Sequence, residues 1–539
     1  MGVGHDGGWG MTLTGNRASV VVIGGGLAGI SAAIGLADAG LDVTLLEGRA
    51  WLGGATCSFV RRGLTIDNGQ HVFVRSCVAY RDLLARLGVT ASCSLQDRLD
   101  LTVLGPEATA RLQRSGLPAP LHLVRALAAY RLLSGAERAK VAATAIALQF
   151  ADIGGPDDRS LDDWLARHGQ SEHARRMLWD LLSLSALNVS AERADLPLAV
   201  SAIRSAILAG RSNADLGVPS VPLSALHGAP AAALFSQLRV TVRLGVRATA
   251  VHESSSGGYD VRLSHDPQAG PVREPVFGAG PAQIHAAGIV LAVPAWDAAA
   301  LVPGGLAADA ATWSDLEPSP VVSVHVIYGS RVTRLPFAAA VGSPVHWVVD
   351  KSAAAGLHAG QYLAASVRGA DAYVDRSAAA LRAEFLPALE RLFPAAAQAA
   401  VVDFFITRER RATIAHVPGS QRWRPAAAAG PPCFAIAGAW TDTGWPDTME
   451  GAVRSGLAAA QKVSGELPRR RPVTASPVPT SPVPTSPVPT STGSTNTAAG
   501  VGAQLPSAAP GLPQAGRATA GTTATDPAEV SKHEMTSTS

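Results

Sequence analysis

The chain has 539 residues, of which 47% are hydrophobic, and its formal net charge at pH 7 is only +3. This length allows two or more domains with their own cores, and the near-balance of charge, with no basic patch between aromatics, excludes a nucleic-acid-binding protein. Cysteine is scarce, and no pair of cysteines has metal-binding spacing. The sequence therefore predicts neither a metal site nor a disulfide framework, and we expect the protein in the reducing cytoplasm.

Both ends of the chain are expected to lie outside the globular part. Residues 1–17 are glycine-rich without the apolar core of a signal peptide, so we expect a disordered extension and no secretion. Residues 467–539 are rich in proline, serine, threonine and alanine and repeat the string SPVPT, a composition that cannot bury a core. We therefore expect a disordered tail. No apolar run reaches the roughly 18 residues of a transmembrane helix, and none is predicted.

Between these ends, predicted strands and helices alternate, which indicates an α/β fold. Ser19–Ile23 is a short apolar run typical of a buried parallel strand. Gly26–Gly40 is predicted to be a helix, and Leu41–Leu46 the next strand. This order predicts a Rossmann-type domain with a parallel sheet.

Three later segments extend the pattern. Leu121–Phe150 is predicted to form helices with a break near Ser134-Gly135. Val240–Val251 and Tyr259–Leu263 flank a serine- and glycine-rich string and predict a β-hairpin. Gly288–Val293 predicts another buried strand.

A glycine-rich turn follows the first predicted strand and fits the pattern GxGxxG. Gly24 permits the tight turn, Gly26 lets the backbone approach a pyrophosphate, and Gly29 allows close helix–strand packing. The helix N-terminus offers free N–H groups and a positive dipole end to the phosphates. We predict that a dinucleotide contacts Gly24, Gly26, Leu27, Ala28 and Gly29.

The acidic residue Glu47 ends the second predicted strand, where a carboxylate accepts hydrogen bonds from ribose hydroxyls. Gly48, Arg49 and a glycine doublet, Gly53-Gly54, follow it. This extension resembles that of the FAD-binding amine oxidase and phytoene desaturase superfamily, in which the doublet lies against the pyrophosphate with a basic residue nearby. The resemblance implies FAD, rather than NAD, as the cofactor of these residues.

A second string resembles the segment that borders the flavin in the same superfamily. It includes Asp67-Asn68-Gly69-Gln70-His71. Asp-Asn-Gly also makes a good turn without any cofactor, and taken alone the string favours a turn. The resemblance implies that Gly69, Gln70 and His71 contact FAD.

A third string lies near the end of the globular part. An apolar strand passes through Gly438 into a loop, and Asp447 with Glu450 three residues later fits a capping box that starts a helix near Thr448. In the superfamily this helix end faces the N1/O2 edge of the flavin, and a positive helix end favours the anionic reduced flavin. The resemblance implies FAD contacts from Gly438, Thr448 and Met449, and we expect capping rather than catalysis from the two carboxylates.

The strings DNGQHVF (67–73), VPLSALHG (221–228) and WTDTGWPDTMEGAVRSG (440–456) together resemble the squalene-associated FAD-dependent desaturase family. The resemblance covers roughly Val20 to Ala460. The characterised activity of this family implies that hydroxysqualene, an allylic alcohol, is reduced to squalene by hydride from reduced FAD. The electron source would be NAD(P)H or a reductase. The chain departs from the pattern at Ala439, where an aspartate commonly holds a ribityl hydroxyl of FAD.

The implied reaction needs a general acid because hydroxide leaves poorly. His71, His227 and Asp442 are the candidates by chemistry and motif position, with His71 first. The substrate is a long hydrocarbon that starts in lipid, so we expect an apolar tunnel and peripheral docking on the inner face of the plasma membrane. Residues 100–219 are the predicted docking region, although they also fit an ordinary helical cap.

These expectations divide the chain into alternating segments. The predicted FAD-binding parts are 18–99, 220–300 and 431–466, and an α+β substrate domain takes 100–219 and 301–430. A carotenoid desaturase or isomerase is the nearest alternative function. An amine oxidase is a weaker one, because no aromatic amine-binding cage is identifiable. A non-catalytic FAD-binding membrane-associated scaffold is an alternative of another class, suggested by Ala439 and the proline-rich tail.

Overall fold

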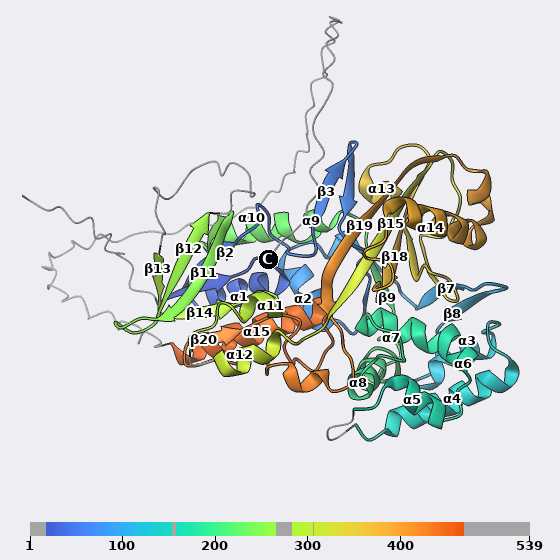
Figure 1. The fold of residues 1–539 in the computed structure, drawn as a ribbon, viewed down its shortest axis with the longest axis horizontal. Helices are drawn as coiled ribbons and strands as arrows, with labels where there is room; N and C mark the ends of the chain where they lie inside the picture. The colour runs from blue at the N-terminus through green and yellow to red at the C-terminus, as the bar shows by residue number, and fades with distance from the viewer. Residues whose placement is uncertain (1–17, 154–157, 266–282, 305–306, 468–539) are drawn as a thin grey trace, which may run out of the picture. The chain divides into compact units, whose positions relative to one another are not determined.

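The computed structural model describes residues 18–153, 158–265, 283–304 and 307–467. The extension predicted at 1–17 and nearly all of the tail predicted at 467–539 lie outside these residues. Two sheets dominate the described part, one parallel and one mostly antiparallel (Figure 1).

The parallel sheet confirms the predicted α/β fold. Its five strands stand in the order β10 (Thr241–Leu244), β2 (Asp42–Glu47), β1 (Ser19–Ile23), β14 (Gly288–Leu291) and β20 (Phe434–Ile436). Every neighbouring pair is parallel. The strand β1 is buried on both faces, as its unbroken apolar run predicts.

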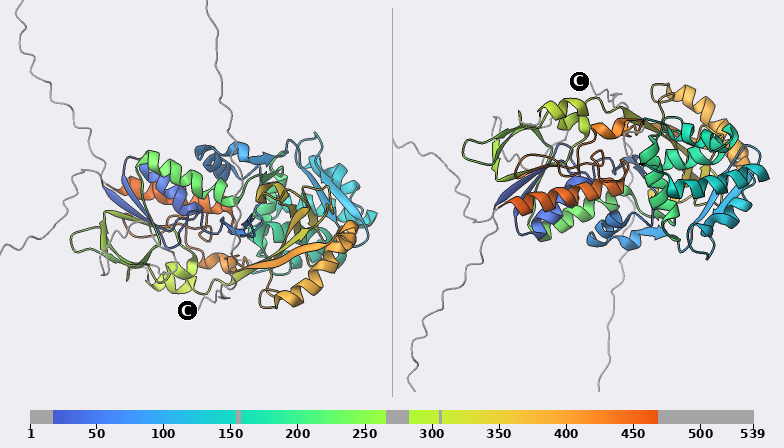
Figure 2. Two further views of the ribbon diagram at one scale, coloured as in Figure 1. Left: turned by 90° about the horizontal axis from the view of Figure 1, so that it is seen from above. Right: turned by 90° about the horizontal axis from the view of Figure 1, so that it is seen from below.

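Two different layers cover this sheet (Figure 2). On one face, α1 (Leu27–Asp38), α10 (Gly228–Leu238) and α15 (Met449–Glu466) share an apolar core with the strands. On the other face lie β11 (Val246–Glu253), β12 (Tyr259–His265) and β13 (Gln283–Ala286), which form an antiparallel sheet. The predicted hairpin is therefore present. Gly245, at φ +69°, divides the predicted strand Val240–Val251 between the two sheets.

The second large sheet has seven strands, in the order β19 (Val401–Ile414), β15 (Pro318–Tyr328), β18 (Gln361–Arg368), β17 (Trp347–Asp350), β16 (Phe337–Ala340), β7 (Asp100–Leu104) and β8 (Thr109–Gln113). Only the β16–β7 pair is parallel. The helix α14 (Ala378–Leu392) packs on one face. Residues 100–219 therefore supply two strands of this sheet as well as helices.

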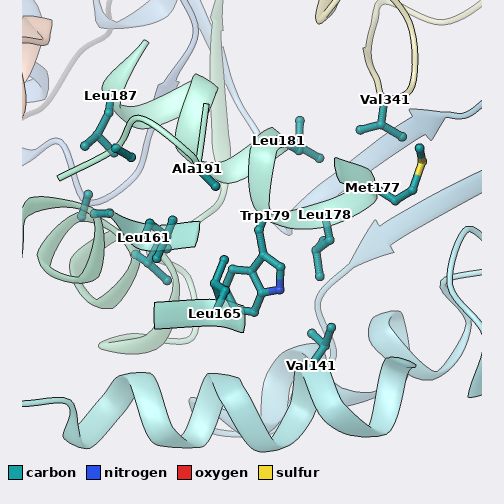
Figure 3. Packing of buried hydrophobic residues seen from close by; sticks show 14 of the residues in the cluster. Val141, Leu161, Leu165, Met177, Leu178, Trp179, Leu181, Leu187, Ala191 and Val341 are labelled. Atoms are coloured by element: carbon teal, nitrogen blue, oxygen red, sulfur yellow. The ribbon is translucent and has the colours of Figure 1, made fainter. Parts of the chain in front are cut away.

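A helical cluster packs beside β7 and β16. It contains α4 (Gly135–Phe150), α5 (Leu161–Arg167), α7 (Asp180–Leu187) and α8 (Leu196–Ile203) around a core in which Trp179, Leu165 and Leu178 meet (Figure 3). The predicted helical stretch starts with η2 (Leu121–Leu123) and α3 (Val124–Ala128). The predicted break is also present, because Ser134 caps α4 in a capping box with Glu137.

Two negative findings apply to the described ranges. None of their helices is long and apolar enough to cross a membrane. Their histidine, cysteine and acidic side chains form no group that could hold a metal ion.

Candidate functional site

The glycine turn after β1 has the geometry that the motif predicts. Gly24 has φ +107°, and a Cβ there would lie 2.2 Å from the carbonyl oxygen of Ala292. A Cβ on Gly29 would lie 1.9 Å from the Gly24 oxygen, so both positions require glycine. At Gly26 the nearest atom to such a Cβ is 3.9 Å away, which leaves the front of the turn open.

This open side faces the start of α1. Gly26 is the N-cap of the helix and has no capping side chain, and Leu27 and Ala28 form its first turn. The N–H groups of a first helical turn have no partner inside the helix. The turn thus offers both space and donors to a phosphate group.

Glu47 is held at the carboxyl end of β2. Its Oε2 accepts a hydrogen bond from the N–H of Gly25 at 2.7 Å, and its Oε1 accepts one from the N–H of Arg49 at 2.8 Å. These bonds fix the carboxylate beside the glycine turn, while its remaining lone pairs can accept bonds from ribose hydroxyls.

The glycine doublet lies across the same turn. Gly53 donates its N–H to the oxygen of Gly25 at 2.9 Å, and a Cβ on Gly54 would lie 2.9 Å from the Cα of Gly26. The Arg49 guanidinium donates to the Gly54 oxygen at 3.1 Å, and Gly48 follows Glu47 directly. The segments that contain the predicted pyrophosphate contacts are therefore in direct contact with each other.

The start of α15 differs from the predicted capping box. Thr448, rather than Asp447, is the N-cap, and its hydroxyl accepts from the N–H of Gly451 at 3.3 Å. Glu450 instead accepts from the N–H groups of Ala79 and Tyr80, at the start of α2 (Val78–Arg86). The prediction was wrong because the buried Glu450 is stabilised by the positive end of another helix.

Gly438 and Ala439 precede this helix. The N–H of Gly438 donates to the Ser455 hydroxyl at 2.9 Å, and its carbonyl accepts from Thr441, so its backbone polar groups already have partners. Ala439 contributes only its carbonyl, to Arg424. The free N–H groups of the first turn of α15, beginning at Met449, remain available to a ligand.

The segment at 67–71 lies beside the seven-stranded sheet, where the Thr407 hydroxyl on β19 donates to the Asn68 carbonyl at 3.2 Å. Asp67 ends β4 (Leu64–Asp67) and pairs with Lys351 at 2.8 Å, both side chains being at most 6% exposed. The other carboxylate oxygen of Asp67 accepts from the Ser58 hydroxyl at 2.7 Å and from the N–H of Leu223 at 2.9 Å. The ion pair fixes the end of β4 immediately before Gly69, Gln70 and His71.

His71 has a hydrogen bond of 3.3 Å between Nδ1 and the Gly69 carbonyl, so Nδ1 carries the proton and Nε2 is an acceptor. Burial lowers the pKa of His71 to about 4. The ring is therefore neutral at pH 7. A role as general acid would require substrate binding to change this arrangement.

The other two candidate acids lie in contrasting places. His227 is fully buried, its Nε2 is hydrogen-bonded to the Tyr80 hydroxyl at 2.8 Å, and burial lowers its pKa to about 3. Asp442 is exposed and accepts from the N–H of Gly444 at 3.1 Å within a turn. The negative charge of Asp67 acts on both His71 and His227, and it opposes the lowering of their pKa values. Asp442 lies at the surface.

Asp447 has properties that the sequence did not reveal. Its carboxylate accepts from the N–H of Ile414 at 2.9 Å, and its own N–H donates to Nε2 of His416 at 2.8 Å. Burial raises its pKa to about 6. Its partners lie more than thirty residues away in the sequence, so no local signal identifies them.

A stability measurement can test this environment. The folded state holds the Asp447 proton more tightly than the unfolded chain, so stability is lost as pH rises from about 4 to about 6. Asp447→Asn should therefore be more stable than the wild type at pH 8, by up to about 2 kcal/mol, and this difference should largely disappear at about pH 3.5. Thermal unfolding at both pH values is the measurement. An equal difference at the two values would contradict the raised pKa.

Residues 27–464 match the family model described as flavin containing amine oxidoreductase. The hydroxysqualene dehydroxylase of Rhodopseudomonas palustris is 28% identical over 452 residues, which are 83% of this chain and 98% of that protein. The ζ-carotene desaturase of Arabidopsis thaliana is 28% identical over 180 residues, covering 31% of this chain and 32% of its own length. A triple mutant of putrescine oxidase with redesigned cofactor binding has the same fold, with a TM-score of 0.63 and 17% identity over 83% of this chain and 99% of that one.

Proposed function

Because the chain belongs to the flavin containing amine oxidoreductase family and is an FAD-dependent oxidoreductase, we propose that it is a hydroxysqualene dehydroxylase. The observation that supports this proposal most strongly is how much of the chain each relative matches. The dehydroxylase from R. palustris matches 83% of this chain, whereas the carotene desaturase from A. thaliana matches 31%. The proposed product is squalene, a precursor of hopanoids.

The residues of the site fit FAD. The open front of Gly26 admits a pyrophosphate, and the fixed carboxylate of Glu47 suits a ribose. The positive end of α15 at Met449 favours negative charge at the pyrimidine edge of the flavin. Ala439 provides no side-chain hydrogen bond, so the ribityl chain relies on other contacts.

When bound and reduced, FAD supplies the hydride that replaces the allylic hydroxyl. The residues of the chain position the cofactor, exclude water and bind the substrate. The electrons come from NAD(P)H or from a reductase. His71, His227 and Asp442 stay candidates for protonating the departing oxygen.

An anaerobic incubation tests the reaction. We expect purified protein with FAD, a reductant and hydroxysqualene to yield squalene, detected by mass spectrometry, and no squalene when FAD or reductant is omitted. Flavin binding without squalene would overturn the proposed substrate and favour a carotenoid precursor. Binding of FAD without turnover of either class of substrate would favour the non-catalytic FAD-binding scaffold.

The same assay tests His71. General acid catalysis typically contributes roughly a hundredfold or more, so loss of the acid should lower the rate by at least that factor. A His71→Ala variant that loses no more than about threefold would exclude this role. The matched control is His168→Ala, since His168 stacks on Trp164 in the helical cluster.

Peripheral docking on a bilayer is part of the proposal. The substrate already lies in lipid, so transfer into the protein gains little of the roughly 0.8 kcal/mol per CH₂ that transfer from water would give. Direct access from the bilayer then becomes important. Large apolar side chains are exposed in the predicted docking region, namely Leu117, Leu121, Val124, Ile146 and Phe150.

Two hydrogen bonds connect the segments that carry these side chains to η4 (Arg204–Leu208) and the residues after it. Arg204 donates to the carbonyl of Leu148 near the end of α4, and Arg211 donates to the carbonyl of Gly116. The segment that carries Ile146 and Phe150 and the segment that begins at Leu117 are thus both hydrogen-bonded to residues 204–211. Nearby basic residues, including Arg125 and Lys140, suit an anionic lipid surface.

Vesicle flotation tests the docking. Replacing Leu121 and Phe150 (81% exposed) together by glutamate should weaken binding to anionic vesicles at least about tenfold, because two buried apolar side chains are lost. Val402→Glu, on β19 and 61% exposed, is the matched control and should float as the wild type does. Equal flotation of all three proteins would count against docking through this region.

A further inference from the structure

The seven-stranded sheet has two different faces at β15, β18 and β19, one apolar and one that carries both apolar and polar side chains. One set of alternating side chains packs with α14 and includes Val322, Val324, Leu363, Ala365 and Val367. The intervening residues project to the opposite side. We expect an enzyme for a hydrocarbon substrate to need few polar side chains where the substrate binds. Polar side chains on this second face therefore indicate a specific contact with a polar group.

A polar row crosses this second face. The strand registers set Ser366 opposite Ser323, and Ser323 opposite Thr407. The hydroxyl of Thr407 donates to the carbonyl of Asn68 at 3.2 Å. The loop that carries Gln70 therefore lies against the row.

Two side chains at this junction are buried without hydrogen-bond partners among the described residues. Gln70 is 7% exposed, and neither its amide nitrogen nor its amide oxygen has a partner. Ser366 is 1% exposed, and its hydroxyl is also unpartnered. A buried polar group without a hydrogen-bond partner destabilises the fold, so orphans of this kind point to a polar ligand.

Arg368 lies two residues beyond Ser366 on the same face of β18. Its Nε is buried without a partner, and within the described ranges no carboxylate pairs with its guanidinium. Burial lowers its pKa to about 10. The charge of Arg368 also acts on His71, which places the guanidinium near the 68–71 loop.

We propose that Arg368, Ser366 and Gln70 form a binding site for the oxygen of an isoprenoid alcohol, and that Arg368 stabilises the negative charge that this oxygen gains as it leaves. The inference rests on the proposed function and assigns the polar end of the substrate to this site. A fixed cation beside a developing oxyanion is worth most where water is excluded.

The proposed step balances as follows. The C–O bond breaks as a hydride reaches the carbon, and the oxygen keeps the bonding pair and takes a proton, for which His71, His227 and Asp442 are the candidate donors, to become water. The substrate gains the two electrons of the hydride, which bound FAD would supply and which NAD(P)H or a reductase would replace. Arg368 keeps its proton and binds the departing oxygen.

Thermal stability separates this role from a structural one. Arg368→Met removes a half-buried guanidinium whose Nε has no partner among the described residues, so the variant should unfold at a temperature at least equal to that of the wild-type holoenzyme, or about 2 °C higher. Arg424 is the matched control, because its guanidinium donates to the carbonyls of Trp440, Thr441 and Trp445. Arg424→Met should unfold at a lower temperature. A comparable fall for Arg368→Met would overturn the proposal.

Binding to the oxidised holoenzyme is the second measurement. Flavin absorbance would be titrated with two isoprenoids of equal carbon number, farnesol and farnesene. The wild type should prefer the alcohol, and Arg368→Met should weaken farnesol binding at least about tenfold while leaving farnesene binding unchanged. Arg368→Lys should retain part of the preference. Equal weakening for both ligands, or no preference in the wild type, would overturn the proposed site.

The results also separate this inference from the proposed function. A wild type that prefers the alcohol through Arg368 but makes no squalene from hydroxysqualene would overturn the reaction and support the oxygen site. A wild type that makes squalene, with an Arg368→Met variant that keeps both its rate and its farnesol affinity, would overturn the site and leave the reaction standing.

Discussion

Replacing Lys351 by methionine should lower the free energy of unfolding by about 3–5 kcal/mol, because the substitution leaves the Asp67 carboxylate buried without its cation. Both side chains are at most 6% exposed, and their charged atoms are 2.8 Å apart. The Ser58 hydroxyl and the Leu223 N–H remain as donors to Asp67, but neither carries a charge. The shift of the urea midpoint measures the loss.

A second variant distinguishes the ion pair from simple packing. Asp67→Asn combined with Lys351→Met removes both charges, and it should recover a substantial part of the stability lost by Lys351→Met alone. A double variant as unstable as the single one would contradict the argument. So would a loss below about 1 kcal/mol for Lys351→Met, the level of an exposed ion pair.

The effect should extend to the site. The pair joins the end of β4 to the start of α13 (Ser352–Ala355), whose N-cap is Lys351. Gln70 and His71 follow Asp67 within four residues, so their position depends on this anchor. We therefore expect the Lys351 variant to bind FAD less tightly even where it remains folded.

The parallel sheet and the glycine turn could be predicted because local rules determine them. An unbroken apolar run such as Ser19–Ile23 forms a strand buried on both faces, and Gly24 and Gly29 are required by backbone contacts within the motif itself. Glu47 was predicted for the same reason, since it ends the strand that follows the motif.

The remaining parts depend on residues far apart in the chain. Glu450 bonds to the N–H of Tyr80, which is 370 residues away, so a capping box read from neighbouring residues assigned it to the wrong helix. The Asp67–Lys351 pair spans 284 residues. Among the described residues, the Nε of Arg368 is buried without a hydrogen-bond partner, a property that only the folded chain reveals.

The strand order of the seven-stranded sheet also depends on residues far apart in the chain. The strand β7 pairs with β16 through Val103 and Leu104, which meet Ala339 and Ala340. A strand of five residues has too short a pattern to predict such a partner. The helices between them were predictable, because α4 has a local capping signal at Ser134.

Gly26→Ala should produce a folded protein that has lost its cofactor. Gly26 has φ −74° and ψ −178°, which alanine adopts without strain, and a new Cβ would have no neighbour closer than 3.9 Å. The methyl group would instead occupy the open front of the turn, where we propose that the pyrophosphate approaches the backbone. We expect the unfolding temperature of the apoprotein to stay unchanged and the Kd for FAD to rise about a hundredfold or more, a loss of about 3 kcal/mol.

Gly29→Ala provides the contrast that makes this result specific. Its Cβ would lie 1.9 Å from the Gly24 carbonyl oxygen, so the turn itself must move, and both stability and FAD binding should fall. Titration of each apoprotein with FAD, followed by flavin fluorescence, together with thermal unfolding without cofactor, measures the two effects separately. If Gly26→Ala binds FAD as tightly as the wild type, the pyrophosphate does not lie at this turn. If it instead unfolds like Gly29→Ala, the glycine serves the fold rather than the ligand.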